Sequence, residues 1–408
     1  QRRDEVEIEG ARTTFQVSAA YDDSMALPAD MVMVYSTEDR GWKDRGYTMA
    51  TMQMMNKADG NEYHNAHPED LQIQSDGRGI YGTEPGEGRA WNDIINESSR
   101  NSYQSQEFID WQKARVTQMV QNYNPQTVVF EEPEYFRRGL YGGGYQELWK
   151  EYYGSEWVDP ISSPEAVMMS QRLNVALECN AIRQLSSHYQ SLSPTGLFGV
   201  AAHSHFNYRA HDITAGIYSM AATGKVDTII GQAWSDTIKH SFLYNGAQIQ
   251  RPFRLGYLEY ATYIDAAVKN NAQLFALIDP MSDEKEKHTE EELRTLNRHQ
   301  VVASLMHPEI NRWENCIWPD RAFRDVSGDY KSELMSIFNA LNDISGKDYS
   351  LTAGTPGVTY LMSDTFTWQM VPIDDAHCPR DEEVENFIQR YRSATSQKYD
   401  RIITRFSC

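Results

Sequence analysis

Eight short apolar runs, most of them followed at once by polar or charged residues, constrain the fold of this chain more than any other feature. β-Branched and aromatic residues in such short runs favour strands that are covered on both faces, as in a parallel sheet. Helical segments lie between several of the runs, and this alternation predicts an α/β fold, a (β/α)8 TIM barrel with long loops. The predicted strands extend over 14–21, 31–35, either 71–73 or 79–81, 128–130, 197–202, 226–230, 255–258 and 274–278.

The helices between these runs are predicted from spacing and from capping residues. In the segment 105–123, five apolar residues recur at helical spacing and share one face: Phe108, Trp111, Val116, Met119 and Val120. Ser163 and Pro164 form a helix start, with serine as the cap and proline at the first helical position, and this helix is expected to end near Tyr189. Further helices are expected over 289–306 and 331–342.

A doubly wound sheet is the competing fold, but it usually has a glycine-rich turn after its first strand. Here the first predicted strand is followed by Asp22, Asp23 and Ser24. We therefore expect a barrel over residues 1–350. Residues 351–408 are expected to form a C-terminal extension, either a segment that caps the barrel or the start of a second domain.

Composition narrows the possible partners. The chain has 58 Asp and Glu against 38 Lys and Arg, a formal charge of -20, which would repel a nucleic acid backbone or an anionic membrane. No apolar run is long enough to span a bilayer. Aromatic residues make up 12% of the chain. Their flat faces suit stacking on sugar rings, although most of them are expected to pack in the core and loops. The sequence gives no indication of the oligomeric state.

The start of the chain and its cysteines bear on location. Because Gln1 stands first, we expect that an N-terminal segment has been removed, and a secreted or periplasmic location is our expectation. The four cysteines are widely spaced without a CxxC pair, which argues against a zinc knuckle. They are Cys179, Cys316, Cys378 and Cys408.

Two glutamates at predicted strand ends are the candidate catalytic residues. Glu132 follows the fourth predicted strand within the acidic run Glu131-Glu132-Pro133-Glu134, and Glu259 follows the seventh. In a barrel, both would lie at the C-terminal mouth, where such folds keep their active sites. Two carboxyl groups that face each other across a cleft suit glycoside hydrolysis, in which one is an acid and the other an ionised nucleophile or base.

Acids at the ends of strands four and seven resemble those of the clan A glycoside hydrolases, which are retaining barrel enzymes. The resemblance implies that Glu132 is the acid/base and Glu259 the nucleophile. The usual clan motif is Asn-Glu-Pro, so Glu131 would occupy the place of the asparagine that holds the sugar 2-hydroxyl. No cofactor and no metal is implied by this resemblance, and the expected partner is a carbohydrate substrate.

Residues 125–345 are also similar to poorly characterised bacterial barrel proteins described as glycoside hydrolases. The motifs that carry this similarity are the Glu131–Glu134 run, Trp149–Ser163, His203-Ser204 with Asn207-Tyr208, Gln232-Ala233-Trp234, Leu258-Glu259-Tyr260, and Asp279-Pro280 with Asp283. Amides and imidazoles match pairs of sugar hydroxyls, and aromatic faces stack on sugar rings. The predicted substrate contacts are Glu131, Asp22, His203, Asn207, Tyr208, Gln232, Trp234, Tyr260 and Asp279.

Two alternatives stay open. His203 and His205, with a strand-end acid such as Asp279, could bind a metal ion in a metal-dependent hydrolase. A non-catalytic glycan-binding barrel would keep the pocket without the reaction. Each candidate also has a plain structural interpretation: Glu132 and Glu259 as loop caps or ion-pair partners, and Trp234 as a core residue.

Overall fold

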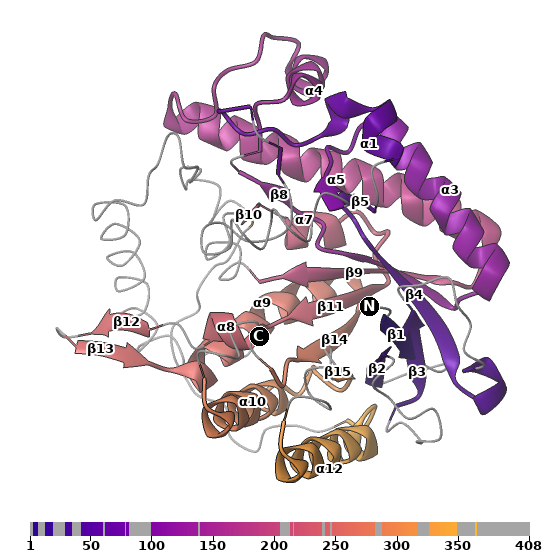
Figure 1. The fold of residues 1–408 in the computed structure, drawn as a ribbon, viewed down its shortest axis with the longest axis vertical. Coiled ribbons are helices and arrows are strands. Elements are labelled where there is room, and N and C mark those ends of the chain that lie inside the picture. Colours follow the sequence, from indigo (N-terminus) through magenta and orange to yellow (C-terminus); the bar gives the residue numbers. More distant parts are fainter. Residues whose placement is uncertain are drawn as a thin grey trace.

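A computed structural model gives the fold of the chain (Figure 1). It describes residues 3–6, 13–18, 29–34, 42–59, 62–77, 79–80, 99–137, 139–204, 213–214, 216–238, 241–244, 247–281, 288–315, 326–348 and 364. Every structural statement below concerns these residues.

Eight parallel strands close into a barrel, which confirms the predicted (β/α)8 fold. In order around the barrel they are β2 (Thr13–Ser18), β3 (Met31–Val34), β4 (Thr48–Met54), β7 (Thr127–Glu131), β9 (Leu197–His203), β11 (Thr228–Gln232), β14 (Gln273–Ile278) and β15 (Trp313–Asn315). β15 pairs in parallel with β2, and β2 with β3, so the ring is complete. The short β1 (Arg3–Val6) is antiparallel to β2 and β3.

Two of the predicted strands were wrong, and two real strands were not predicted. The third strand is β4; Leu71 and Ile73 make only isolated bridges. Residues 255–258 belong to helix α9 (Pro252–Asn270), because the apolar spacing continues past them at the helical period. The segment 274–278 is therefore strand seven, and the three-residue β15 is strand eight. The segment 128–130 is still the fourth strand, because the wrongly predicted third strand and the missed strand β4 both precede it and cancel in the count.

The remaining elements connect or cover these strands. The helices are α1 (Glu62–Ala66), α3 (Gln106–Tyr123), α4 (Gly143–Tyr153), α5 (Pro164–Leu192), α7 (Ile217–Ala221), α8 (Ser235–Ile238), α9, α10 (Glu290–Leu305) and α12 (Gly328–Ile344), with short 3-10 turns at Lys43–Arg45 and Pro68–Asp70. The additional strands are β5 (Lys57–Asp59), β6 (Ser99–Asn101), β8 (Tyr135–Phe136), β10 (Ile213–Thr214), β12 (Ser241–Tyr244) and β13 (Ala247–Gln250).

Capping residues begin the long helices where the sequence predicted. The Ser105 and Ser163 side chains accept hydrogen bonds from the backbone N–H groups of Phe108 and Ala166. Thr289 forms a capping box with Glu292 at the start of α10. The four predicted helices over 105–123, 163–189, 289–306 and 331–342 are thus confirmed as α3, α5, α10 and α12.

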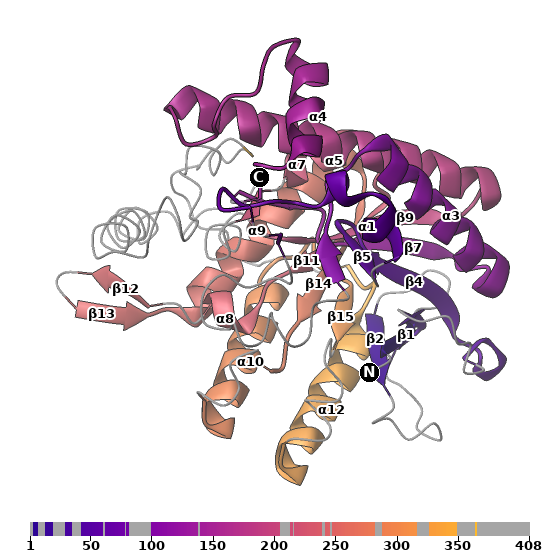
Figure 2. The same cartoon turned by 45° about the horizontal axis from the view of Figure 1, so that its top comes forward.

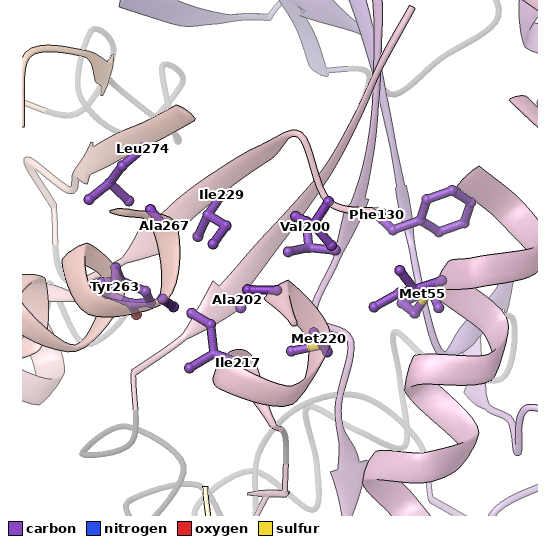
Figure 3. Packing of buried hydrophobic residues seen from close by; sticks show 14 of the residues in the cluster. Met55, Phe130, Val200, Ala202, Ile217, Met220, Ile229, Tyr263, Ala267 and Leu274 are labelled. Atoms are coloured by element: carbon purple, nitrogen blue, oxygen red, sulfur yellow. The ribbon is translucent and has the colours of Figure 1, made fainter. Parts of the chain in front are cut away.

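Two apolar layers hold the barrel together. An inner layer fills the barrel with side chains from the strands: Met31, Met33, Ala50, Met52, Val129, Ala201, Ile230, Phe275 and Leu277, with Trp234. An outer layer packs the other face of the strands against the helices, and Figure 3 shows part of it, with Val200, Ala202 and Ile229 facing Ile217 and Tyr263. Because side chains alternate along a strand, the inner layer also fixes which neighbours point into the barrel.

Helix α9 lies against β11 through one glycine. A Cβ atom added to Gly231 would come within 2.6 Å of the Tyr263 ring, so only glycine allows this approach. The Tyr263 hydroxyl donates to the backbone carbonyl of Gln232, 3.0 Å away. This contact fixes the end of strand six, where the barrel mouth begins.

Figures 1 and 2 show α3 and α5 together on one side of the barrel, and α10 and α12 on another. In both views the β12–β13 hairpin projects from the barrel edge. No helix in the described ranges is long and apolar enough to cross a membrane. Asp364 is the one residue of the predicted extension 351–408 that the structure describes, and its carboxylate accepts hydrogen bonds from the backbone N–H groups of Tyr218 and Ser219 on α7.

Candidate active site at the ends of strands four and five

Strand alternation brings polar side chains to the C-terminal mouth of the barrel. Val129, Ala201 and Ile230 lie in the inner layer, so the residues two positions later point to the same side. These are Glu131, His203 and Gln232, and all three are buried. The carboxyl ends of strands four, five and six therefore supply an acid, an imidazole and an amide to one rim.

Glu132 has an unusual backbone at the end of strand four. Its φ of 51° is left-handed, a region that residues other than glycine, asparagine and aspartate seldom adopt. Its N–H donates to the carbonyl of Ala201 at 2.8 Å, and Pro133 follows. The chain thus leaves the strand by a strained turn that interrupts the strand alternation and keeps the Glu132 backbone beside strand five. Strain of this kind occurs most often at functional sites.

Glu134 and His203 form a buried pair. Each carboxylate oxygen of Glu134 lies 2.9 Å from Nδ1 of His203, and the two side chains are only 5% and 9% exposed. Burial by itself would lower the pKa of His203, but the adjacent Glu134 charge outweighs it and the pKa is raised above its usual value. The pair is therefore an ion pair over a wider pH range than an exposed histidine would allow.

Glu132 joins this pair to make a three-residue cluster. One ligand atom from each of Glu132, Glu134 and His203 lies within 4.8 Å of the other two. Nζ of Lys57, which begins β5, lies 3.4 Å from Oε2 of Glu132. We call Glu132, Glu134, His203 and Lys57 the rim cluster. It combines two neighbouring carboxyl groups with two cationic side chains, so the two acids do not share one environment.

An indole and an amide stand next to the rim cluster. The Trp234 ring centroid lies 6.1 Å from that of His203. Nε1 of Trp234 donates to Oε1 of Gln232 at 3.0 Å, and Nε2 of Gln232 donates to the carbonyl of Ala201 at 3.3 Å. Gln232 is therefore held by its neighbours and in turn orients the tryptophan. Trp234 is 8% exposed and also packs on the inner layer, so it is a core residue as well as a neighbour of the rim cluster.

Asp279 follows strand seven, but the structure gives it an architectural role. It is fully buried, and its two carboxylate oxygens accept from the backbone N–H groups of Ser235 and Met281 at 3.0 and 3.1 Å. The Ser235 hydroxyl donates to its carbonyl at 2.7 Å. These bonds tie strand seven to the start of α8, and Asp279 lies outside the rim cluster.

The strand end that was the basis for choosing Glu259 does not exist, because Glu259 lies on α9. Glu259 is 1% exposed, and burial raises the pKa of its carboxyl group well above the usual value, an effect that a hydrogen bond from Ser204 opposes. Tyr260 is fully buried in the outer layer and donates to the carbonyl of Leu277 at 2.7 Å. Tyr260 thus packs between α9 and strand seven, and its predicted contact with a sugar stays a prediction.

Four other predicted residues lie outside the described part of the chain: Asp22, His205, Asn207 and Tyr208. The structure adds Lys57 to the site, and this residue follows the unpredicted strand β4. It also pairs Glu134, an acid of the run that the sequence singled out, with His203. Glu314 on β15 is buried and pairs in register with Leu277 of the inner layer, which places it on the inner side of strand eight. Glu314 could have been identified from the sequence only if residues 313–315 had been recognised as strand eight.

Fold and site together define a (β/α)8-barrel protein with a carboxylate–histidine cluster at the ends of strands four and five. No family model and no curated protein matches the sequence. Similar solved structures include a β-galactosidase from the Antarctic haloarchaeon Halorubrum lacusprofundi (9% identity, TM-score 0.49, 76% of this chain and 51% of that one). Another is a GH42 β-galactosidase from G. stearothermophilus (11% identity, TM-score 0.45, 87% and 56%).

A β-galactosidase from the psychrophilic Marinomonas ef1 is also similar (12% identity, TM-score 0.38, 72% of this chain and 52% of that one). All three are structures of β-galactosidases. The chain spans about half the length of each. With identities of 9–12% and TM-scores under 0.5, they say nothing about the substrate or the reacting residues of this chain.

Proposed function

We propose that this protein is a glycoside hydrolase and that its reacting carboxyl groups are Glu132 and Glu134. The observation that carries the proposal is the strained turn at Glu132, with its φ of 51°, which brings the Glu132 and Glu134 carboxyl groups together at the catalytic end of the barrel. Glu259 no longer serves as the partner, because it is buried on a helix.

Different surroundings suit the two acids to different roles. His203 neutralises Glu134 and keeps it ionised, as a nucleophile must be. Glu132 lies beside that negative charge and is the more exposed of the two, at 14% against 5%, which suits an acid that must meet the leaving-group oxygen. The close approach of their oxygens, within 4.8 Å, fits the carboxyl separation of about 5–5.5 Å in retaining enzymes better than the wider separation in inverting ones.

Substrates that differ in leaving group test the two roles. A panel of α- and β-linked aryl glycosides and oligosaccharides first identifies a cleaved sugar. Glu132→Gln should then lose at least about 100-fold in kcat/KM on an unactivated oligosaccharide, because proton donation contributes roughly 10²–10⁴-fold. Its kcat/KM on a dinitrophenyl glycoside should stay near the wild-type value, because that leaving group needs no proton, while kcat falls because Glu132 also activates the water of the second step.

Azide separates acid from nucleophile. Azide should rescue Glu132→Ala with formation of the glycosyl azide of retained configuration, and Glu134→Ala with the azide of inverted configuration. Glu165→Gln, at an exposed acid on the first turn of α5, is the control and should behave like wild type. Equal loss on both leaving groups in Glu132→Gln, with no azide product, would overturn the assignment.

A metal-dependent hydrolase is the second candidate, and the rim cluster is the observation that favours it. Two carboxylates and an imidazole whose ligand atoms lie within 4.8 Å resemble the donor sets that bind zinc or manganese. Lys57 already supplies a positive charge 3.4 Å from Glu132, which disfavours a metal cation there and favours the glycosidase. Activity that a chelator removes and zinc or manganese restores would support this second function; activity indifferent to chelators supports the first.

A further inference from the structure

Glu178 is a second buried acid behind the rim cluster. It lies in the middle of α5, the 29-residue helix that packs against strand five. Its side chain is fully buried, and the group that favours its ionised form is the neutral Asn56 amide. An ionised carboxylate in such a place would be costly, whereas a protonated one is tolerated much better.

The groups around Glu178 connect it to the site. The Asn56 amide lies beside its carboxyl group and donates to the backbone carbonyl of Glu134. The side chain of Asn56 is itself fixed by Gln104, which donates to Oδ1 of Asn56 at 2.7 Å. Tyr135, next to Glu134 in the chain, is also close to Glu178. Glu178 thus supports the segment that carries the proposed nucleophile.

The charge of Glu134 acts on Glu178, so the two acids do not ionise independently. Burial raises the pKa of Glu178 well above its usual value, and the neighbouring charge of Glu134 raises it further, while Asn56 partly opposes the shift. Glu134 differs because His203 lies 2.9 Å from it and supplies the compensating positive charge. A proton therefore belongs on Glu178 and the negative charge on Glu134.

We propose that Glu178 is a positioning residue of this site, a carboxyl group held protonated behind Glu134. The single negative charge of the two acids then stays on Glu134, where it pairs with His203. The effect of Glu178 on turnover rests on the proposed function. Its protonation state does not, and it can be measured without a substrate.

The first test is infrared difference spectroscopy of the full chain at neutral pH. The spectrum of wild type minus Glu178→Gln should contain the C=O stretch of a protonated carboxylic acid, because the substitution removes that group and keeps a neutral side chain of the same shape. Glu165→Gln, on the same helix, removes an exposed carboxylate and should show only the carboxylate bands. A Glu178→Gln difference spectrum with carboxylate bands alone overturns the proposal.

The second test follows His203 by NMR. Its titration should be unchanged in Glu178→Gln and should move to lower pH in Glu134→Gln, since only Glu134 carries the charge. An equal downward shift in both variants would mean that the charge is shared, and would also overturn the proposal. Both readouts hold even if the protein turns out not to be a glycosidase.

The third test is kinetic, on the glycoside that wild type cleaves. Glu178→Gln should keep kcat/KM within about threefold, whereas Glu178→Ala should lower kcat about tenfold with little change in KM, because Glu134 loses its support. A rise in KM with unchanged kcat in Glu178→Ala would contradict a positioning role. Should Glu178→Ala fail to fold, the infrared and NMR results on Glu178→Gln still decide.

Discussion

At the scale of residues, the proposed chemistry depends on the segment Glu131–Glu134. Glu131, Glu132 and Glu134 follow one buried strand, and the structure gives each a different direction: Glu131 to the inner side of the barrel, Glu132 to the strained turn and Glu134 to His203. The sequence predicted that this acidic run lies at the C-terminal mouth of the barrel. It could not predict which acid meets which partner, because the left-handed φ of Glu132 breaks the alternation from which directions are inferred.

The Glu134–His203 pair makes stability depend on pH. The pKa of His203 is raised in the folded state, since the Glu134 charge outweighs the opposing effect of burial. A raised folded-state pKa gives stability that is fully present below the unfolded value of about 6.5 and is lost as pH rises through the folded value. Unfolding free energy should therefore fall as pH rises from about 6.5 in wild type.

Urea unfolding from pH 5 to 9 measures this dependence. In Glu134→Gln the fall above pH 6.5 should be absent or much smaller, because the charge that raises the His203 pKa is gone. Parallel pH curves for the two proteins would contradict the ion pair.

At the scale of elements, most of the barrel could be predicted, but two strands and one helix could not. β4 and the three-residue β15 went unrecognised, β4 because of its weak alternation and β15 because it is so short. The run 255–258 lies in a buried helix, and a short apolar run looks the same in a buried strand and in a buried helix. Because 255–258 was predicted to be a strand, Glu259 was taken for a strand-end residue and chosen as the nucleophile.

The contact between α9 and β11 is a test of the helix assignment. Gly231→Ala would drive a methyl group into the Tyr263 ring, whose contact at 2.6 Å leaves no room. We expect a loss of about 1–3 kcal/mol in unfolding free energy from this overpacking. Gly143→Ala is the matched control: nothing lies within 4 Å of its added Cβ atom, and it begins α4, so it should be neutral or stabilising. Equal stability of both variants would speak against this packing.

At the scale of the whole molecule, the closed ring of eight strands places all the strand ends at one mouth. The predicted extension 351–408 contacts the barrel at Asp364, which caps the start of α7 with bonds of 3.1 and 2.8 Å to backbone N–H groups and 2.6 Å to the Ser219 hydroxyl. The two alternatives for residues 351–408, a capping segment or the start of a second domain, stay predictions. The sequence could not predict the contact of Asp364 with α7, because a single Ser-Asp pair does not indicate which helix it will cap.

Removing this cap should destabilise the barrel itself. Asp364→Ala should lower the unfolding free energy by about 1–2 kcal/mol, as loss of a helix cap does, in a single cooperative transition. Asp343→Ala, an exposed acid near the end of α12, should have no effect or a slightly stabilising one. If Asp364→Ala melts like wild type, the hydrogen bonds of Asp364 to α7 do not stabilise the barrel.

The central claim is that Glu134 is the nucleophile of a retaining glycosidase whose acid is Glu132. The most direct test is to trap the intermediate. The 2-deoxy-2-fluoro derivative of the sugar that the enzyme cleaves, with an activated leaving group, is incubated with wild type, and the digested protein is analysed by mass spectrometry. The account predicts one glycosyl group, esterified to Glu134. A label on any other carboxylate, such as Glu314 or Glu259, would contradict it.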